Sequence, residues 1–176
     1  MEFETKRLYT KTTSADFSDY IEAQSKDVAP SPDIMELLDK SLAEHSNEIV
    51  PEDFPTLMCL CEKWRGNALE TLKVIRKDGD EVIGYFQFMD ADTPTPYVGL
   101  ELIYKYRHMG YGTELLLGAL DALRHAGGYK AMGYATSVHN PNSIALAEKC
   151  GGILQKPAFP HLHFFFKEYM LPVSND

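Results

Sequence analysis

One segment of this chain runs as a strand through a glycine turn directly into a leucine-rich helix, and this order limits the folds that the chain can adopt. Residues 97–104 have the composition of a strand, and residues 107–112 form an R-x-x-G-x-G turn. Leucines at spacings of three and four then predict a helix over about 110–125. Glycines let the backbone turn tightly, and the first N–H groups of a helix have no partners within it. The pattern therefore predicts an anion-binding turn, to which Lys105 and Arg107 add positive charge.

Two familiar phosphate-binding loops differ from this turn. No lysine follows Gly112, so the turn lacks the G-x-x-x-x-G-K-[ST] pattern of a P-loop. The G-x-G-x-x-G of dinucleotide-binding domains is missing as well, because Leu115 stands where the third glycine would be. An ATPase and a dinucleotide oxidoreductase are therefore both disfavoured. Taken alone, the six residues also fit an ordinary strand-to-helix turn.

Hydrophobic periodicity along the rest of the chain predicts strands and helices around one sheet. The expected strands cover about 3–12, 69–75, 82–88, 97–104, 129–138 and 162–171. The expected helices cover about 14–26, 32–45, 51–64, 110–125 and 141–150. The fold class is α/β (α+β), with a mostly antiparallel sheet and one strand–helix–strand unit near 97–138. At 176 residues, we expect one domain spanning 1–176.

The charge balance and the cysteines limit the partners and the location. With 17 Lys and Arg against 26 Asp and Glu, the net charge of −9 disfavours nucleic acid and anionic membranes as partners. No apolar run approaches the ~18 residues that span a bilayer, and the N-terminus lacks the order of a secretory signal. Three cysteines are too sparse for a disulfide framework, and no second pair joins Cys59 and Cys61 in a zinc site. We therefore expect a cytoplasmic protein.

Three motifs resemble one protein family. The R-x-x-G-x-G turn resembles the acetyl-CoA motif of the GNAT superfamily of N-acetyltransferases. Residues 140–151 are similar to the N-x-x-S-I-x-x-A-E-K-x-G helix of the subgroup related to ribosomal-protein N-terminal acetyltransferases, and residues 4–8 resemble its E-T-x-R-L start. The expected order of elements matches the GNAT plan along nearly the whole chain, with residues 28–66 the least similar. The resemblance implies a single GNAT-type domain with a V-shaped sheet and flanking helices.

The resemblance also implies where acetyl-CoA would bind as cosubstrate. In GNAT proteins the strand before the motif splays from its neighbour, and its backbone amides bind pantetheine and the thioester. That role falls on Leu102, Ile103 and Tyr104. Asn140 would hydrogen-bond the pantetheine arm, a role that is compatible with capping a helix. The residues that would hold the pyrophosphate are Arg107, His108, Met109, Gly110, Tyr111, Gly112 and Thr113.

The candidate catalytic groups follow from one departure from the family and from the chemistry of an amine acceptor. Many GNAT enzymes protonate the leaving thiolate with a tyrosine, whose place is taken here by Ala147. Ser143 is the local substitute, acting through water, and its alternative is a solvent-facing serine. An ammonium acceptor must lose a proton, and Glu101 is the candidate base. The alternative for Glu101 is a cross-strand pair with a Lys or Arg, and Glu114 is expected only to favour the helix dipole.

The expected reaction is direct transfer of an acetyl group from acetyl-CoA to a primary amine, without a covalent enzyme intermediate or a metal. His161 and His163 share one face of a strand, but no third ligand is spaced to join them. The excess of acidic residues suits a cationic small-molecule or peptide acceptor, and the protein is expected to be a monomer or a homodimer. A CoA-binding sensor or partner protein without catalysis is the first alternative, and a nucleotide-dependent anion-binding domain is the second.

Overall fold

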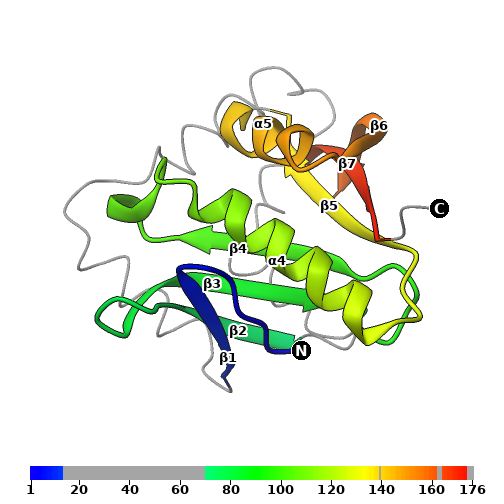
Figure 1. Cartoon of the computed structure of the whole chain (residues 1–176). Coiled ribbons are helices and arrows are strands. Elements are labelled where there is room, and N and C mark those ends of the chain that lie inside the picture. The colour runs from blue at the N-terminus through cyan, green and yellow to red at the C-terminus, as the bar shows by residue number, and fades with distance from the viewer. Residues whose placement is uncertain (14–69, 139, 162–163, 174–176) are drawn as a thin grey trace.

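Seven strands form one sheet (Figure 1). They are β1 (Leu8–Thr12), β2 (Glu70–Arg76), β3 (Glu81–Met89), β4 (Tyr97–Leu102), β5 (Ala131–Ser137), β6 (Ile153–His161) and β7 (Phe164–Pro172). Their order is β1-β2-β3-β4-β5-β7-β6, and every neighbouring pair is antiparallel except β4 and β5. The structure is a computed structural model that describes residues 1–13, 70–138, 140–161 and 164–173. The mostly antiparallel α/β class predicted from the sequence is confirmed.

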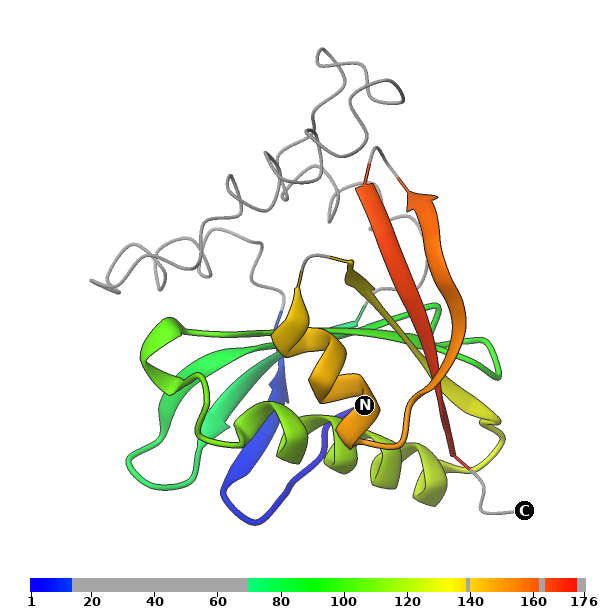
Figure 2. The same ribbon diagram turned by 90° about the horizontal axis from the view of Figure 1, so that it is seen from above.

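Two α-helices lie on one side of this sheet (Figure 2). Helix α4 (Tyr111–Ala126) connects β4 to its parallel neighbour β5, and α5 (Pro141–Lys149) connects β5 to β6. A short 3₁₀ helix, η2 (Tyr104–Tyr106), lies between β4 and the glycine turn. Helix α4 forms because its apolar residues recur every three or four positions, which directs six of them at the sheet. These are Tyr111, Leu115, Leu116, Ala119, Leu120 and Leu123.

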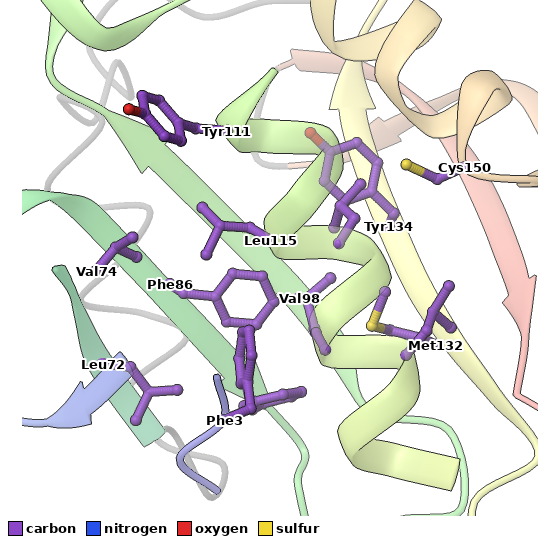
Figure 3. Close-up of a cluster of buried hydrophobic side chains, with 14 of the residues drawn as sticks. Phe3, Leu72, Val74, Phe86, Val98, Tyr111, Leu115, Met132, Tyr134 and Cys150 are labelled. Carbon is purple, nitrogen blue, oxygen red and sulfur yellow. The ribbon is translucent and has the colours of Figure 1, made fainter. Parts of the chain in front are cut away.

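The main core lies between α4 and the sheet (Figure 3). Phe3, Phe86 and Phe88 meet edge to face, with ring centroids 5.1 to 6.4 Å apart. Such aromatic pairs are worth about 0.5–1.5 kcal/mol beyond the area that they bury. Val98 of β4 and Met132 of β5 face the same core. This core fixes α4 against the sheet, and so it fixes the position of the helix N-terminus.

The N-terminal segment differs from the single strand predicted over residues 3–12. It folds back on itself: the Thr10 N–H donates to the Phe3 carbonyl at 2.9 Å, and the Thr5 N–H donates to the Leu8 carbonyl at 2.8 Å. Only Leu8–Thr12 pairs with β2. The alternation of apolar and polar residues is the same in one long strand and in a tight hairpin, so the pattern could not separate them.

Strand β6 was not predicted, and its sequence explains why. It contains Pro157 and Pro160, which cannot donate to a sheet ladder, and its pairing with β7 shifts register twice. Prolines are tolerated there because β6 is an edge strand of the sheet. The predicted strand over 97–104 also ends early, since Tyr104 belongs to η2. The helices predicted over 14–26, 32–45 and 51–64 lie outside the described residues.

Candidate active site

A gap opens where β4 and β5 part. The two parallel strands pair at only two positions, Tyr97 with Gly133 and Val98 with Tyr134, although β4 continues to Leu102 and β5 to Ser137. On its other edge β4 stays paired with β3 along its whole length. The splay that the family resemblance implies for this strand is therefore present in the structure.

The backbone N–H and C=O groups of successive residues in β4 point alternately toward β3 and toward β5. The Pro96 carbonyl accepts from β5, whereas the Ile103 N–H donates to the Ile83 carbonyl on the β3 side at 3.0 Å. Because successive residues of a strand direct their N–H groups to opposite edges, the N–H groups of Leu100 and Leu102 point toward the gap. The Ile103 carbonyl also accepts from the Tyr106 N–H. Of the strand amides expected to bind the thioester, that of Leu102 faces the gap, and that of Ile103 is engaged within the sheet.

The glycine turn exposes the start of α4. Gly110, the N-cap of the helix, has φ 80°, a left-handed conformation that glycine adopts without strain, and it supplies no capping side chain. The N–H groups of the first helical turn therefore have no acceptor within the helix, and the helix dipole adds about half a positive charge. A side-chain Cβ at Gly112 would lie 3.3 Å from Leu146 of α5. The two helices thus pack closely beside the turn.

Glu114 and Arg7 hold this turn from behind. The Glu114 carboxylate accepts hydrogen bonds from the Thr5 hydroxyl at 2.6 Å, the Arg7 N–H at 2.7 Å and the Arg7 guanidinium at 2.6 Å. Arg7 also donates to the Met109 carbonyl at 3.1 Å and stacks on the Tyr111 ring. Burial alone would raise the pKa of Glu114, but these hydrogen bonds outweigh it and lower the pKa. Beyond favouring the helix dipole, Glu114 joins the N-terminal motif to the turn.

Lys105 and Arg107, the basic residues between β4 and the glycines of the turn, both form ion pairs. Arg107 donates to the Glu101 carboxylate at 2.6 Å and to the Leu102 carbonyl at 2.8 Å, and its side chain is largely buried. Lys105 pairs with Glu81 at 3.0 Å on the surface. The alternative that the sequence left open for Glu101 was a cross-strand pair with a Lys or Arg; the structure shows a pair with an Arg, but this arginine comes from the turn after β4 and not from a neighbouring strand. Positive charge at the turn is therefore partly neutralised, and the helix amides carry more of its attraction for anions.

The start of α5 brings a third group to the gap. The Asn140 side chain accepts from the Ser143 N–H at 3.1 Å and so caps the helix, with Pro141 at the first helical position. The Ser143 hydroxyl lies 2.6 Å from the hydroxyl of Tyr134 on β5. Tyr134 is buried, and this burial raises the pKa of its phenol to about 12, with the Glu101 charge adding to the effect.

Sequence reasoning did not single out Tyr134. In a strand that alternates apolar and polar positions, Tyr134 has the pattern of a core residue, and its ring does line the core (Figure 3). Its hydroxyl meets Ser143 only because α5 folds back over β5. No local sequence signal reports that contact.

The sequence of the chain matches a known protein family. A family model described as the acetyltransferase (GNAT) family matches residues 33–152, more than half of the chain. The chain belongs to the GNAT acetyltransferase family. It is an acetyl-CoA-dependent N-acetyltransferase of that family, and acetyl-CoA is its cosubstrate. No curated protein matches the sequence.

Solved GNAT structures have the same fold. A GNAT acetyltransferase from Bacillus anthracis superposes with a TM-score of 0.64 at 17% identity, covering 98% of this chain and 99% of that one. A chimera of the Vibrio cholerae spermidine N-acetyltransferase SpeG and hSSAT gives 0.62 at 16% identity, covering 96% of each chain. RimL, a ribosomal-protein α-N-acetyltransferase in complex with coenzyme A, gives 0.62 at 15% identity, covering 100% of each chain.

The residues of this GNAT protein fit its cosubstrate. A diphosphate suits the uncapped N-terminus of α4, and the pantetheine chain suits an edge of β4 that directs N–H groups toward a gap. One family feature is missing, because Ala147 of α5 is fully buried and carries no proton donor. A hydroxyl at this helix comes instead from Ser143.

Among the residues that the structure describes, no three or more His, Cys, Asp and Glu side chains are grouped as metal ligands. The side chains of His161 and His163 lie outside that set. None of the described helices has the length and apolar character needed to cross a membrane. The expectations of a metal-free reaction and a cytoplasmic location stay predictions.

Proposed function

We propose that the protein transfers the acetyl group of acetyl-CoA directly to a primary amine in the gap between β4 and β5. The amine nitrogen attacks the thioester carbon, the carbon–sulfur bond breaks, and the proton lost by nitrogen matches the one gained by sulfur. The observation that carries this proposal is the opening of that gap beside the uncapped N-terminus of α4. The pyrophosphate of the cosubstrate would then lie against the first N–H groups of α4, and its thioester against the N–H groups of β4 that face the gap.

The cosubstrate would be held by the residues that the motifs single out. The Leu102 N–H would polarise the thioester carbonyl, supported by its direction toward the gap. Asn140 would contact the pantetheine arm. The pyrophosphate would lie on the turn from Arg107 to Thr113, chiefly on the first N–H groups of α4. Arg107 would contribute charge there in addition to its pair with Glu101.

Glu101 and Ser143 would act from opposite sides of the gap. Val98 and Leu102 of β4 face the core under α4, so Glu101, an odd number of residues away from each, projects from the other face of the sheet. Ser143 belongs to α5 on the helix side. An amine entering beside Glu101 could pass its proton to that carboxylate, directly or through water, while the thiolate leaves toward Ser143. This arrangement supports Glu101 as the base and Ser143 as the group beside the sulfur.

The acceptor we favour is a cationic amine, such as a polyamine, an aminoglycoside-like amine or a basic peptide N-terminus. The net charge of −9 attracts such molecules. Spermidine and ribosomal-protein acetyltransferases are among the proteins that share the fold.

The proposal is tested by measuring release of the CoA thiol with a panel of primary amines, alongside calorimetric titration with CoA, ATP and NAD. We expect CoA binding and turnover with at least one cationic amine. CoA binding with no turnover on any amine would favour the alternative of a CoA sensor, which the buried Ala147 motivates. Tight ATP binding without CoA binding would contradict the family role altogether.

A further inference from the structure

We infer that Tyr134 is a positioning residue that directs the Ser143 hydroxyl toward the sulfur of the cosubstrate. The inference rests on the proposed function, because it concerns the thiolate released in that gap. It assigns to β5 a task that the buried Ala147 cannot perform from α5.

Tyr134 lies on β5 at the point where the gap begins. Its backbone pairs with Val98 at the last point where β5 meets β4, so its side chain lies where the gap begins. The ring is buried under the two helices, with Cys150 at the end of α5 also facing it (Figure 3). Its hydroxyl reaches Ser143, whose backbone is fixed by the Asn140 cap.

The hydrogen bond between the Tyr134 and Ser143 hydroxyls has a preferred direction. A phenol is a stronger acid than an aliphatic alcohol, and a burial-raised pKa of about 12 keeps the proton on Tyr134 at neutral pH. Either hydroxyl can donate across the 2.6 Å between them, and because the more acidic phenol is the better donor, we take Tyr134 as the donor and the Ser143 oxygen as the acceptor. The serine hydroxyl has a single hydrogen, which must then point away from Tyr134.

An oriented Ser143 hydroxyl can stabilise the leaving thiolate of CoA. A thiol with a pKa near 8.5 leaves as a thiolate that needs only a hydrogen-bond donor, and it can take its proton from water afterwards. A serine hydroxyl held in one orientation is such a donor. No proton leaves Tyr134 in this scheme, so a phenolate is never formed in the buried site. The negative charge of Glu101 disfavours a phenolate at Tyr134 further.

The first experiment compares Tyr134→Phe, Ser143→Ala and the double variant by kcat and KM for acetyl-CoA. We expect each to lower kcat about tenfold with KM within about twofold, and the double variant to match the singles, since both remove one oriented donor. The matched control is Tyr169→Phe, because Tyr169 of β7 is also buried and donates to α5, at Glu148, over 3.1 Å. It should leave kcat unchanged. An unchanged kcat in Tyr134→Phe, or a double variant that loses the product of the two effects, would overturn the inference.

A second experiment needs no acceptor and follows the thiol of bound CoA by the ultraviolet absorbance of its thiolate during a pH titration. The oriented donor stabilises the thiolate, so Tyr134→Phe and Ser143→Ala should each raise the pKa of the bound thiol by about one unit. Tyr169→Phe should leave it unchanged. A wild-type protein that binds no CoA would refute the proposed function, whereas bound CoA with the same thiol pKa in Tyr134→Phe would refute the inference alone.

Discussion

The Glu101 carboxylate and the Arg107 guanidinium lie 2.6 Å apart, where β4 ends and the glycine turn begins. The candidate base is thus joined directly to the first residue of the cosubstrate motif. Arg107 also donates to the Leu102 carbonyl, so one side chain links the strand end, the base and the turn. A phosphate that attracts Arg107 would compete with Glu101, which would couple cosubstrate binding to the state of the base.

Replacing Glu101 with Gln should separate catalysis from binding. We expect turnover to fall about 10²–10⁴-fold, because the amine loses its proton acceptor, and CoA affinity to stay within about threefold. Steady-state kinetics and calorimetry measure the two effects. The control is Glu81→Gln, which removes a surface carboxylate paired with Lys105. Unaltered turnover in Glu101→Gln across the pH range would remove this carboxylate from the mechanism.

Replacing Gly110 with Ala should weaken CoA binding. A side chain at φ 80° costs about 1–2 kcal/mol and favours a changed turn, which would misdirect the first N–H groups of α4. Gly151→Ala is the matched control, since Gly151 has φ 85° at the end of α5 and open space around its Cβ position. Both variants should unfold more easily in urea, but only Gly110→Ala should lose about tenfold in CoA affinity. Equal CoA affinities in the two would show that the turn does not bind CoA.

Glu114 should contribute stability that depends on pH. Its pKa is lowered in the folded protein, so near its usual pKa of 4.5 the unfolded chain binds more protons than the folded one, and stability rises with pH. The contribution is complete above that value and is lost as the pH falls through the lowered one. Glu114→Gln should therefore cost about 1.5–3 kcal/mol at neutral pH in urea unfolding, and the difference should shrink as the pH falls below 4.5. Asp121→Asn, on an exposed part of the same helix, controls for the lost charge. A difference that stays constant with pH would contradict the prediction.

Gly133 should tolerate no side chain while Tyr97 is present. A Cβ there would lie 2.7 Å from the Tyr97 ring, which crosses β5 to donate a hydrogen bond to the buried Glu168 carboxylate. Gly133→Ala should destabilise the protein by about 1–3 kcal/mol, but should cost little more once Tyr97→Ala has removed the ring. Gly99→Ala on β4 is the control, because its Cβ would make only ordinary contacts. Additive effects of Gly133→Ala and Tyr97→Ala on the free energy of unfolding would contradict this packing.

Local sequence patterns predicted those helices and strands whose conformation depends on residues within the element itself. The leucine spacing in α4 and the alternation around a polar turn between β2 and β3 both correspond to observed elements. Strand β6 was not predicted because two prolines, Pro157 and Pro160, are typical of a loop. They are tolerated in this strand because it lies at the edge of the sheet. The N-terminal hairpin escaped because strand alternation is the same before and after a reversal.

The strand–turn–helix unit, the helix cap at Asn140 and the family resemblance could all be predicted from the sequence, since each depends on residues close together in the chain. The pairing of Arg107 with Glu101 and the contact of Tyr134 with Ser143 could be found only in the folded protein. The physical reason is that a motif fixes which groups are present, whereas the direction of a long side chain depends on charges and surfaces supplied by other elements. For Arg107 the other element is the end of β4, which carries Glu101, and for Tyr134 it is the first turn of α5, which carries Ser143. Both contacts lie near the place where β4 and β5 part.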